Sequence, residues 1–205
     1  MIIDVSGSPT YVYTGGRAHV AGQPHVIFIH GVLNDHSVWI LQSRYLAHHG
    51  WNVLAIDLPG QGKSGGTPPA SVEDASAAVL ALLDAAGIQQ AALVGHSWGS
   101  LIALETAARL KDRITHAVLV GTAFPMKVSP ALIDTSLNNP EAAIRMINVF
   151  SRATLAAPPS ALGPGTWVYG ANTALNRRVL RSNPKVNVFH RGFVACDQYA
   201  NGIQA

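Results

Sequence analysis

Four short runs of apolar residues, each ending at small or polar residues, mark the first part of the chain. They cover residues 26–29, 51–56, 91–94 and 117–120. Unbroken apolar runs of this length are typical of strands that are buried on both faces, whereas half-exposed strands alternate apolar and polar side chains. The pattern therefore predicts four buried strands of a mainly parallel sheet.

Segments with the spacing of amphipathic helices lie between these runs. Residues 37–49 are followed by a glycine, residues 71–87 begin with a capping sequence at Ser71, and residues 98–110 are rich in Ala and Leu. Strands and helices in alternation predict an α/β fold with a mostly parallel, doubly wound sheet. Ahead of the first strand, residues 5–19 hold a short aromatic segment among glycines, which predicts a hairpin at the edge of the sheet.

The pattern changes after Gly121. Prolines divide the remaining residues into short helical pieces, such as residues 141–154, and no further run predicts a buried strand. We therefore predict two parts. Residues 1–121 form the core, and residues 122–205 form a helical lid or cap region that rests on the sheet.

Composition narrows the class of protein. A chain of 205 residues with 48% apolar and 12% charged residues has the make-up of one globular domain. The net charge of +3 comes from scattered basic residues, so we expect no nucleic-acid partner. Cys196 is the single cysteine, and we interpret it as a packing residue. The sequence shows neither a signal peptide nor a membrane-spanning run, so we expect a soluble, cytoplasmic protein without membrane insertion.

The third apolar run leads directly into a motif that carries chemistry. Residues 95–99 read Gly-His-Ser-Trp-Gly, which fits the pattern G-x-S-x-G. Where a buried strand turns sharply into a helix, this pattern places the serine at the tip of a strained turn, between small residues. The first amides of the helix and its dipole then favour negative charge beside the serine. Ser97 is therefore a candidate nucleophile.

A second candidate element follows the first apolar run, where the sequence reads His30-Gly31-Val32. Glycine allows the backbone to approach a ligand, and the next amide can donate a hydrogen bond to an oxyanion. The backbone N–H groups of Val32 and Trp98 are therefore the two candidate donors. We interpret His30 as a structural residue whose ring holds the loop by packing or hydrogen bonding.

Two other patterns suggest cofactor sites, but their context does not fit. Residues 60–65 match the dinucleotide pattern G-x-G-x-x-G, yet prolines follow where a helix would have to receive a pyrophosphate. His30, Asp35 and His36 suggest a metal site, yet their spacing misses the usual signature of dinuclear hydrolases. We expect neither a metal nor an organic cofactor.

Three segments, taken in their order along the chain, resemble a known family. His30-Gly31, the loop Asp-Leu-Pro-Gly-Gln-Gly-Lys-Ser at residues 57–64 and the motif at residues 95–99 resemble the α/β-hydrolase fold superfamily, specifically its serine esterase and lipase branch. The resemblance implies that Ser97 is the nucleophile and that the backbone N–H groups of Val32 and Trp98 form an oxyanion hole. It also implies that residues 57–64 are structural.

The resemblance further implies a catalytic acid and then a histidine after the nucleophile, each following a later strand. His116 and His190 are the histidines after Ser97, but neither follows a predicted strand, and no Asp or Glu does so either. The acid and the base are therefore not identified. Three interpretations stay open: the chain ends before the last core strands of a longer enzyme, His190 is a rewired base, or the fold is kept without the chemistry.

The expected function is a serine hydrolase that cleaves small or medium carboxylic esters through an acyl-enzyme on Ser97. Apolar side chains of the lid region would either form a pocket for an apolar group or pack the lid onto the sheet; they are Phe124, Met126, Met146, Phe150, Trp167, Tyr169, Phe189, Phe193 and Tyr199. Alternatives are lactone or thioester hydrolysis, carbon–carbon bond hydrolysis, cofactor-free haloperoxidase chemistry, or a non-catalytic small-molecule-binding protein. The expected partner is a small-molecule ester, and the oligomeric state stays open.

Overall fold

A six-stranded sheet forms the centre of the molecule. The computed structural model describes residues 1–151 and 168–205. In spatial order the strands are β1 (Ile2–Val5), β2 (Ser8–Tyr13), β4 (Asn52–Ile56), β3 (His25–Ile29), β5 (Ala91–His96) and β6 (Ile114–Val120). Strands β4, β3, β5 and β6 are parallel to one another, whereas β1 and β2 form an antiparallel hairpin at one edge and β2 pairs antiparallel with β4. The predicted α/β fold is confirmed, and the hairpin begins three residues earlier than predicted.

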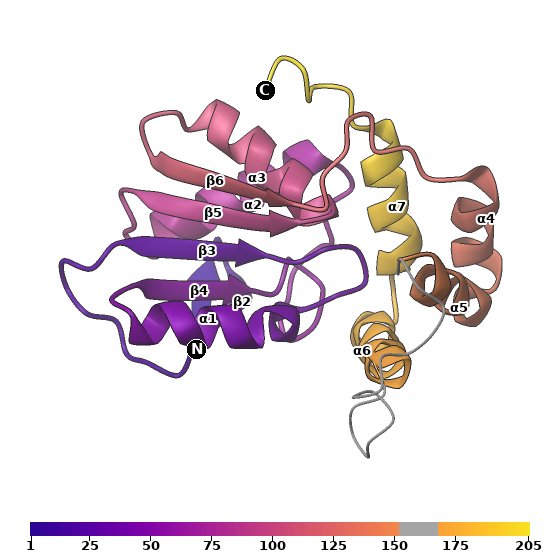
Figure 1. Ribbon diagram of the computed structural model, residues 1–205, viewed down its shortest axis with the longest axis horizontal. Helices are drawn as coiled ribbons and strands as arrows, with labels where there is room; N and C mark the ends of the chain where they lie inside the picture. The colour runs from indigo at the N-terminus through magenta and orange to yellow at the C-terminus, as the bar shows by residue number, and fades with distance from the viewer. Residues whose placement is uncertain (152–167) are drawn as a thin grey trace.

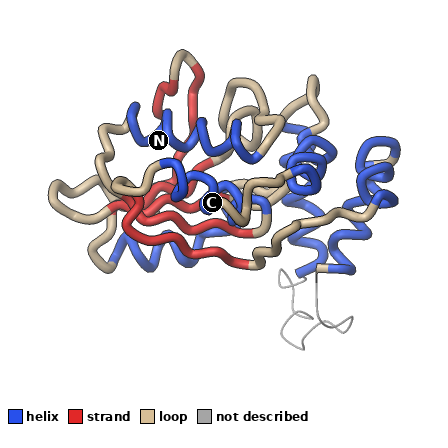
Figure 2. Tube along the Cα trace, turned by 90° about the horizontal axis from the view of Figure 1, so that it is seen from above, coloured by secondary structure: helices blue, strands red, loops and turns tan. Residues whose placement is uncertain are grey.

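Helices cover both faces of this sheet, which explains why the strands read as unbroken apolar runs (Figure 1; Figure 2). On β3, Val26 and Phe28 pack with Trp39 of the short 3-10 helix η1 (His36–Trp39) and with α1 (Ile40–His48). The alternate residues Ile27 and Ile29 pack with α2 (Val72–Ala85) and α3 (Trp98–Arg109). Each of these four β3 residues therefore has an apolar partner on its own side.

A side-chain cap fixes the start of α2, the helix for which the sequence shows a capping pattern. The Ser71 side chain accepts a hydrogen bond from the backbone N–H of Asp74 at 3.0 Å, which satisfies one of the free amides at the start of α2. Gly87 follows the helix with a φ of +66°, a conformation that residues with a side chain rarely adopt. These two residues place α2 as predicted.

Strand β6 differs from its prediction in burial, although it forms where expected. Ala117 is exposed, and Val118 and Val120 keep 48% and 42% of their surface exposed. The cause is the position of β6 at the edge of the sheet, where α3 packs against it and α1 lies over β4 instead. The expectation that residues 117–120 are buried on both faces is therefore wrong.

In the described part of the chain, four helices follow β6 and lie beyond the carboxyl ends of the parallel strands (Figure 1). They are α4 (Pro130–Asn138), α5 (Pro140–Phe150), α6 (Val168–Ser182) and α7 (Val188–Gln198). These helices share an apolar cluster with Leu33 from the loop after β3; its other buried members are Ala143, Ile144, Val179, Val188 and Phe189. Residues 152–154 of the predicted helix and Trp167 lie outside the described residues. Among the described helices, none has the length and apolar character needed to cross a bilayer.

The end of α7 is fixed to the core by a buried carboxylate. Glu105 of α3 accepts hydrogen bonds from the Tyr199 hydroxyl at 2.8 Å and from the Asn201 side chain at 2.9 Å. Cys196 of α7 is buried in the same apolar cluster as α2 and α3, as expected for a packing residue. The helices beyond the sheet are therefore attached to it at a defined angle.

Candidate active site

Ser97 occupies the sharp turn between β5, which ends at His96, and α3, which begins at Trp98. Its backbone has φ 53° and ψ −121°, a conformation that is strained for a residue with a side chain. The Ser97 N–H donates to the carbonyl of Val120 at 2.9 Å, and its carbonyl accepts from the Ser100 N–H at 2.8 Å. These bonds hold the turn from both sides.

The two glycines of the motif are required by space. A Cβ atom on Gly95 would overlap the backbone of Gly99, because strand and helix cross closely here. A Cβ atom on Gly99 would overlap the carbonyl oxygens of Ile29 and His30 at the end of β3. The spacing of small residues around the serine in the sequence therefore has the physical cause that was predicted for it.

The loop after β3 brings a second backbone segment to Ser97. A Cβ atom on Gly31 would lie 3.2 Å from the Cβ atom of Ser97, so only glycine allows this approach without displacement. Val32 follows directly, and Trp98 is the first residue of α3. Within residues 1–151 and 168–205, the backbone N–H groups of Val32 and Trp98 have no acceptor. Both amides are therefore available to a ligand.

Ser97 lies in the wall of a cavity of about 350 Å³. Part of the lining comes from the sheet side: Gly31, Val32, Asn34, His96 and Ser97. The remainder comes from the helices beyond the sheet: Leu132, Ile147, Asn148, Phe150, Ser151, Asn172, Asn176 and Phe193. The structure thus joins the candidate nucleophile and the Val32 segment to residues that the sequence placed in the lid region.

His30 is fully buried and holds two loops together. Its Nε2 atom accepts a hydrogen bond from the Leu58 N–H at 3.1 Å, so its Nδ1 atom carries the proton and donates to the Gly31 carbonyl at 2.8 Å. Burial lowers the pKa of His30, and the ring is therefore neutral near pH 7. The structural role predicted for His30 agrees with these contacts.

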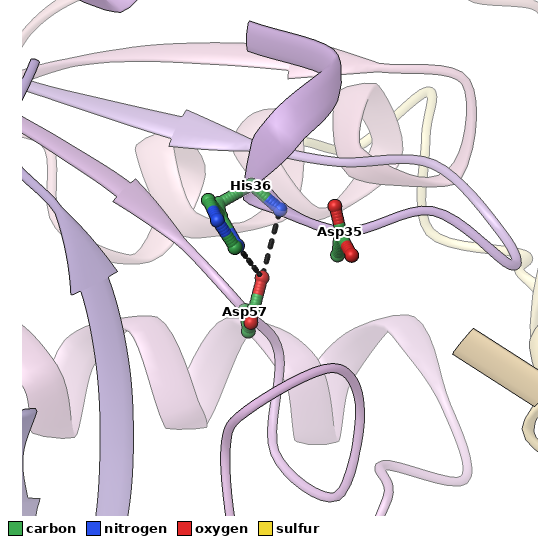
Figure 3. A group of neighbouring side chains, drawn as sticks. All are labelled: Asp35, His36 and Asp57. Atoms are coloured by element: carbon green, nitrogen blue, oxygen red, sulfur yellow. Dashed lines mark hydrogen bonds and ion pairs between the residues drawn. The ribbon is translucent and has the colours of Figure 1, made fainter. Parts of the chain in front are cut away.

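Asp35, His36 and Asp57 form the group of side chains that most resembles a metal site in the described part of the chain. Figure 3 shows two hydrogen bonds from His36 to one oxygen of Asp57, one from the backbone N–H and one from Nδ1, both at 2.7 Å. The other Asp57 oxygen accepts from the Lys63 N–H, and Asp35 accepts from Ser37 and Arg178. Protein donors therefore satisfy every carboxylate oxygen, and the group fixes the loops that follow β3 and β4.

The glycine-rich loop at residues 60–65 folds onto itself. The Gly60 N–H donates to the Gly65 carbonyl at 2.8 Å, and the Ser64 N–H donates to the Gln61 carbonyl at 3.0 Å. Helix α2 begins only at Val72. The loop therefore has no helix start beside it to receive a phosphate, and its position fits the structural role that the resemblance implies.

Within residues 1–151 and 168–205, no candidate base identified from the sequence reaches Ser97. His190 of α7 contacts Ser136 and Ile133 of α4 and lines a different hollow, and His116 lies near the amino end of β6. Among the described histidines, none forms a hydrogen bond with the Ser97 hydroxyl. Two acidic residues that follow Ser97 in the sequence also have other partners: Glu105 accepts from the Tyr199 hydroxyl, and Asp197 accepts from the Val128 N–H.

Several lining residues were missed by sequence reasoning. His96 lines the cavity, and burial lowers its pKa. Its position inside the serine motif was a signal that could have been used. Asn172 and Asn176 are four residues apart on α6 and therefore face the same side of that helix, which was a second usable signal. Asn148 of α5 had no comparable signal.

Comparison with known proteins assigns this architecture to a family. The model of the α/β-hydrolase fold family matches residues 24–165, which is more than half of the chain. The chain belongs to the α/β-hydrolase fold family. The matched residues include the Val32 loop, the loop after β4 and the turn at Ser97, which are the segments that carry the resemblance in the sequence.

Individual relatives agree with this family. The chain is 37% identical over 101 residues to 2-succinyl-6-hydroxy-2,4-cyclohexadiene-1-carboxylate synthase of Serratia proteamaculans, covering 49% of this chain and 38% of that protein. It is 32% identical over 125 residues to Lipase LipV of Mycobacterium tuberculosis, covering 59% of this chain and 46% of that protein. The match thus covers less than half the length of these curated relatives.

Among solved structures, the enol-lactonase from Burkholderia xenovorans LB400 superposes with a TM-score of 0.78. The two sequences are 22% identical, and the match covers 97% of this chain and 75% of that one. At this level of identity the similarity shows the α/β-hydrolase fold alone. It extends over the helices beyond the sheet as well as over the core.

Proposed function

We propose that the protein is a serine hydrolase that cleaves small or medium carboxylic esters through an acyl-enzyme on Ser97. In this proposal the backbone N–H groups of Val32 and Trp98 form the oxyanion hole. Residues 1–121 form the catalytic core, and the helices within residues 122–205 act as a lid over the cavity. No metal or organic cofactor takes part in this chemistry.

The proposed reaction follows from the arrangement around Ser97. Its hydroxyl oxygen attacks the ester carbonyl, and the negative charge that develops on the carbonyl oxygen is held by two backbone amides. The amino end of α3 adds favourable potential at the same place. Loss of one such donor typically costs about 3 kcal/mol of transition-state stabilisation. The bond to the alkoxy group then breaks, and the alcohol leaves with the proton that the Ser97 hydroxyl has lost. Water adds to the acyl-enzyme, the acid is released, and a proton from that water restores the serine hydroxyl.

The observation that carries this proposal is the position of Ser97 itself. Ser97 has a left-handed φ of 53°, lines a cavity and lies beside two amides that have no acceptor among the described residues, and this geometry suits acyl transfer. The cavity volume of about 350 Å³ suits a small ligand. The similarity to Lipase LipV supports an ester as the substrate, and Leu132, Phe150 and Phe193 offer apolar surface for its acyl group.

A fluorophosphonate probe tests the proposal. We expect the probe to modify Ser97, as located by mass spectrometry, and Ser97→Ala to abolish the modification. Ser6 is an internal control, because it shares a positive φ of 54° but lies exposed in the hairpin turn, where no label is expected. Rates on p-nitrophenyl esters of increasing chain length would then measure how large an acyl group the cavity accepts.

A non-catalytic binding protein is the second candidate function. The observation in its favour is that no described histidine bonds to the Ser97 hydroxyl, and a serine without a base is a poor nucleophile. Absence of label on Ser97 in a chain extended past Ala205, as well as in residues 1–205, would favour this candidate over the hydrolase. Lactone, thioester and carbon–carbon bond hydrolysis and haloperoxidase chemistry remain alternatives within the fold, and parallel assays with those substrates distinguish them.

A further inference from the structure

The cavity beside Ser97 has an unusual amide-rich side. Leu132, Ile147, Phe150 and Phe193 give one part of the helical wall an apolar surface. Asn148 of α5 and Asn172 and Asn176 of α6 contribute side-chain amides to the remainder. A pocket for a plain hydrocarbon chain has no need of these amides, since burying polar groups costs free energy.

Two of these asparagines are almost completely buried and bonded to each other. Asn148 is 5% exposed and Asn176 is 4% exposed. The Asn176 side-chain nitrogen donates to the Leu33 carbonyl at 2.9 Å. The Asn148 side-chain nitrogen donates to the Ile144 carbonyl at 2.9 Å and to the Asn176 side-chain oxygen at 3.3 Å.

The backbone carbonyls fix the orientation of both amides. Leu33 offers only an acceptor, so the group of Asn176 that faces it must be the NH₂. Ile144 likewise accepts only, so the NH₂ of Asn148 must face it, and the same NH₂ pairs with the oxygen of Asn176. Rotation of either amide by 180° would bring oxygen against oxygen. The arrangement therefore allows one assignment of oxygen and nitrogen.

This assignment leaves one group without a partner. The Asn148 Oδ1 atom is buried and accepts no hydrogen bond from the described residues. A buried acceptor without a donor typically costs about 1–3 kcal/mol, and such groups in native proteins call for an explanation. Asn148 lines the cavity, but its Oδ1 atom exposes essentially no surface, so a ligand donor reaches this oxygen when binding shifts a neighbouring side chain of the wall.

We propose that the molecule bound beside Ser97 carries a neutral hydrogen-bond donor, an amide N–H or a hydroxyl, that pairs with Asn148 Oδ1. The inference rests on the proposed function, because it takes this cavity as the substrate site. The substrate class becomes esters whose acyl group has an N–H or O–H donor next to apolar surface. Asn148 acts in specificity, whereas Ser97 and the two amides act on the carbonyl.

Binding of matched ligand pairs tests this inference without turnover. The protein is the full chain with Ser97→Ala, and the first pair is N-acetylglycine methyl ester and N-acetyl-N-methylglycine methyl ester. The second pair is methyl 3-hydroxybutyrate and methyl 3-methoxybutyrate. We expect the donor-bearing member of at least one pair to bind about tenfold more tightly, measured by NMR titration, since one neutral hydrogen bond contributes a factor of this size. The pair that discriminates identifies the donor as amide or hydroxyl.

Two variants assign the preference to Asn148. In Asn148→Leu, which removes the acceptor at similar volume, the preference should fall to about one. Asn172→Leu is the matched control, because it also removes an amide from the wall but lies outside the chain of hydrogen bonds between Asn148 and Leu33. Asn172→Leu should keep the preference, and circular dichroism checks that both variants fold. The comparison within the ligand pairs does not depend on either variant.

The outcomes separate this inference from the proposed hydrolase function. Equal affinities within both pairs, or binding of neither member, would overturn the donor requirement even if the fluorophosphonate labels Ser97. A preference that survives in Asn148→Leu would also overturn it. If a donor preference depends on Asn148 but Ser97 takes no label, the hydrogen bond between ligand and Asn148 is supported and the proposed hydrolase function is ruled out.

Discussion

Ser97 illustrates how a strained residue is held in place by its neighbours. Its positive φ places the hydroxyl at a tip, and the crossing of β5 and α3 leaves no room for side chains at Gly95 and Gly99. Gly99 lies in a helix and has an ordinary φ, so its requirement is purely steric. Gly87 gives the opposite case, because its φ is +66° and nothing lies within 4 Å of the place a Cβ would take.

This contrast leads to a prediction about stability. Gly99→Ala should lower the free energy of unfolding by about 3 kcal/mol or more, because the new methyl group overlaps two backbone carbonyls that cannot move independently. Gly87→Ala should cost about 1 kcal/mol from backbone strain alone. Urea denaturation of both variants measures the difference. Equal losses would show that the close crossing at Gly99 is not as tight as described.

His30 leads to a prediction about pH. Burial lowers the pKa of His30 below the value of about 6.5 that it has in the unfolded chain. Below that pH the unfolded state binds a proton that the folded state does not, so stability is present above about pH 6.5 and is lost as pH falls towards the lower, folded-state pKa. Burial also lowers the pKa of His96, which adds to the same trend.

The measurement is the free energy of unfolding between pH 8 and pH 5 in wild type and His30→Asn. The variant cannot gain a proton at this position, so its slope should be smaller by up to about 1.4 kcal/mol per pH unit. The variant is also expected to be less stable at every pH, because the Leu58 N–H loses its acceptor. Identical slopes would contradict the titration of His30.

The contact between α3 and the end of α7 shows how a carboxylate can join two elements. Burial would raise the pKa of Glu105, but hydrogen bonds from Asn201, Tyr199 and Arg109 lower it overall, so the group stays ionised. Burial and the bond to Glu105 raise the pKa of Tyr199, so the hydroxyl stays a donor. Phe193 on the same helix lines the cavity, and the contact therefore helps to position the wall.

Removing the Tyr199 hydroxyl should change the free energy of unfolding by a measurable amount. Tyr199→Phe should reduce the free energy of unfolding by about 2 kcal/mol, the usual size for a hydrogen bond to a charged group. Tyr45→Phe is the control, because Tyr45 is 61% exposed on α1 and a surface change of this kind usually stays within about 0.5 kcal/mol. A loss for Tyr199→Phe no larger than that of the control would argue against the contact.

The elements that could be predicted from the sequence are those with a strong local signal. The unbroken apolar run of β3 and the cap at Ser71 carry their own information, and both elements form where predicted. Burial of β6 could not be predicted in the same way. Its apolar residues 117–120 read like a central strand, and only the order of strands in the sheet shows that it lies at an edge.

The two parts of the cavity differ in the same respect. Ser97 and Gly31 belong to segments whose glycines indicate a close backbone approach, so the contact between these two segments could be predicted. Asn148 and Asn176 come from different helices, and their bond depends on how α5 and α6 pack. The amide pair therefore became visible only in three dimensions. No described histidine forms a hydrogen bond with the Ser97 hydroxyl, which agrees with the missing base in the sequence.

The outer edge of β6 affects how binding and unfolding of this protein should be measured. Among the described residues this strand pairs only with β5, so the backbone amides and carbonyls of its outer edge are free to pair with another extended chain. Val118 and Val120 add exposed apolar surface to this edge. Concentrated samples should therefore associate through strand addition. Ligand affinities and unfolding curves are best recorded in a dilution series and extrapolated to the monomer.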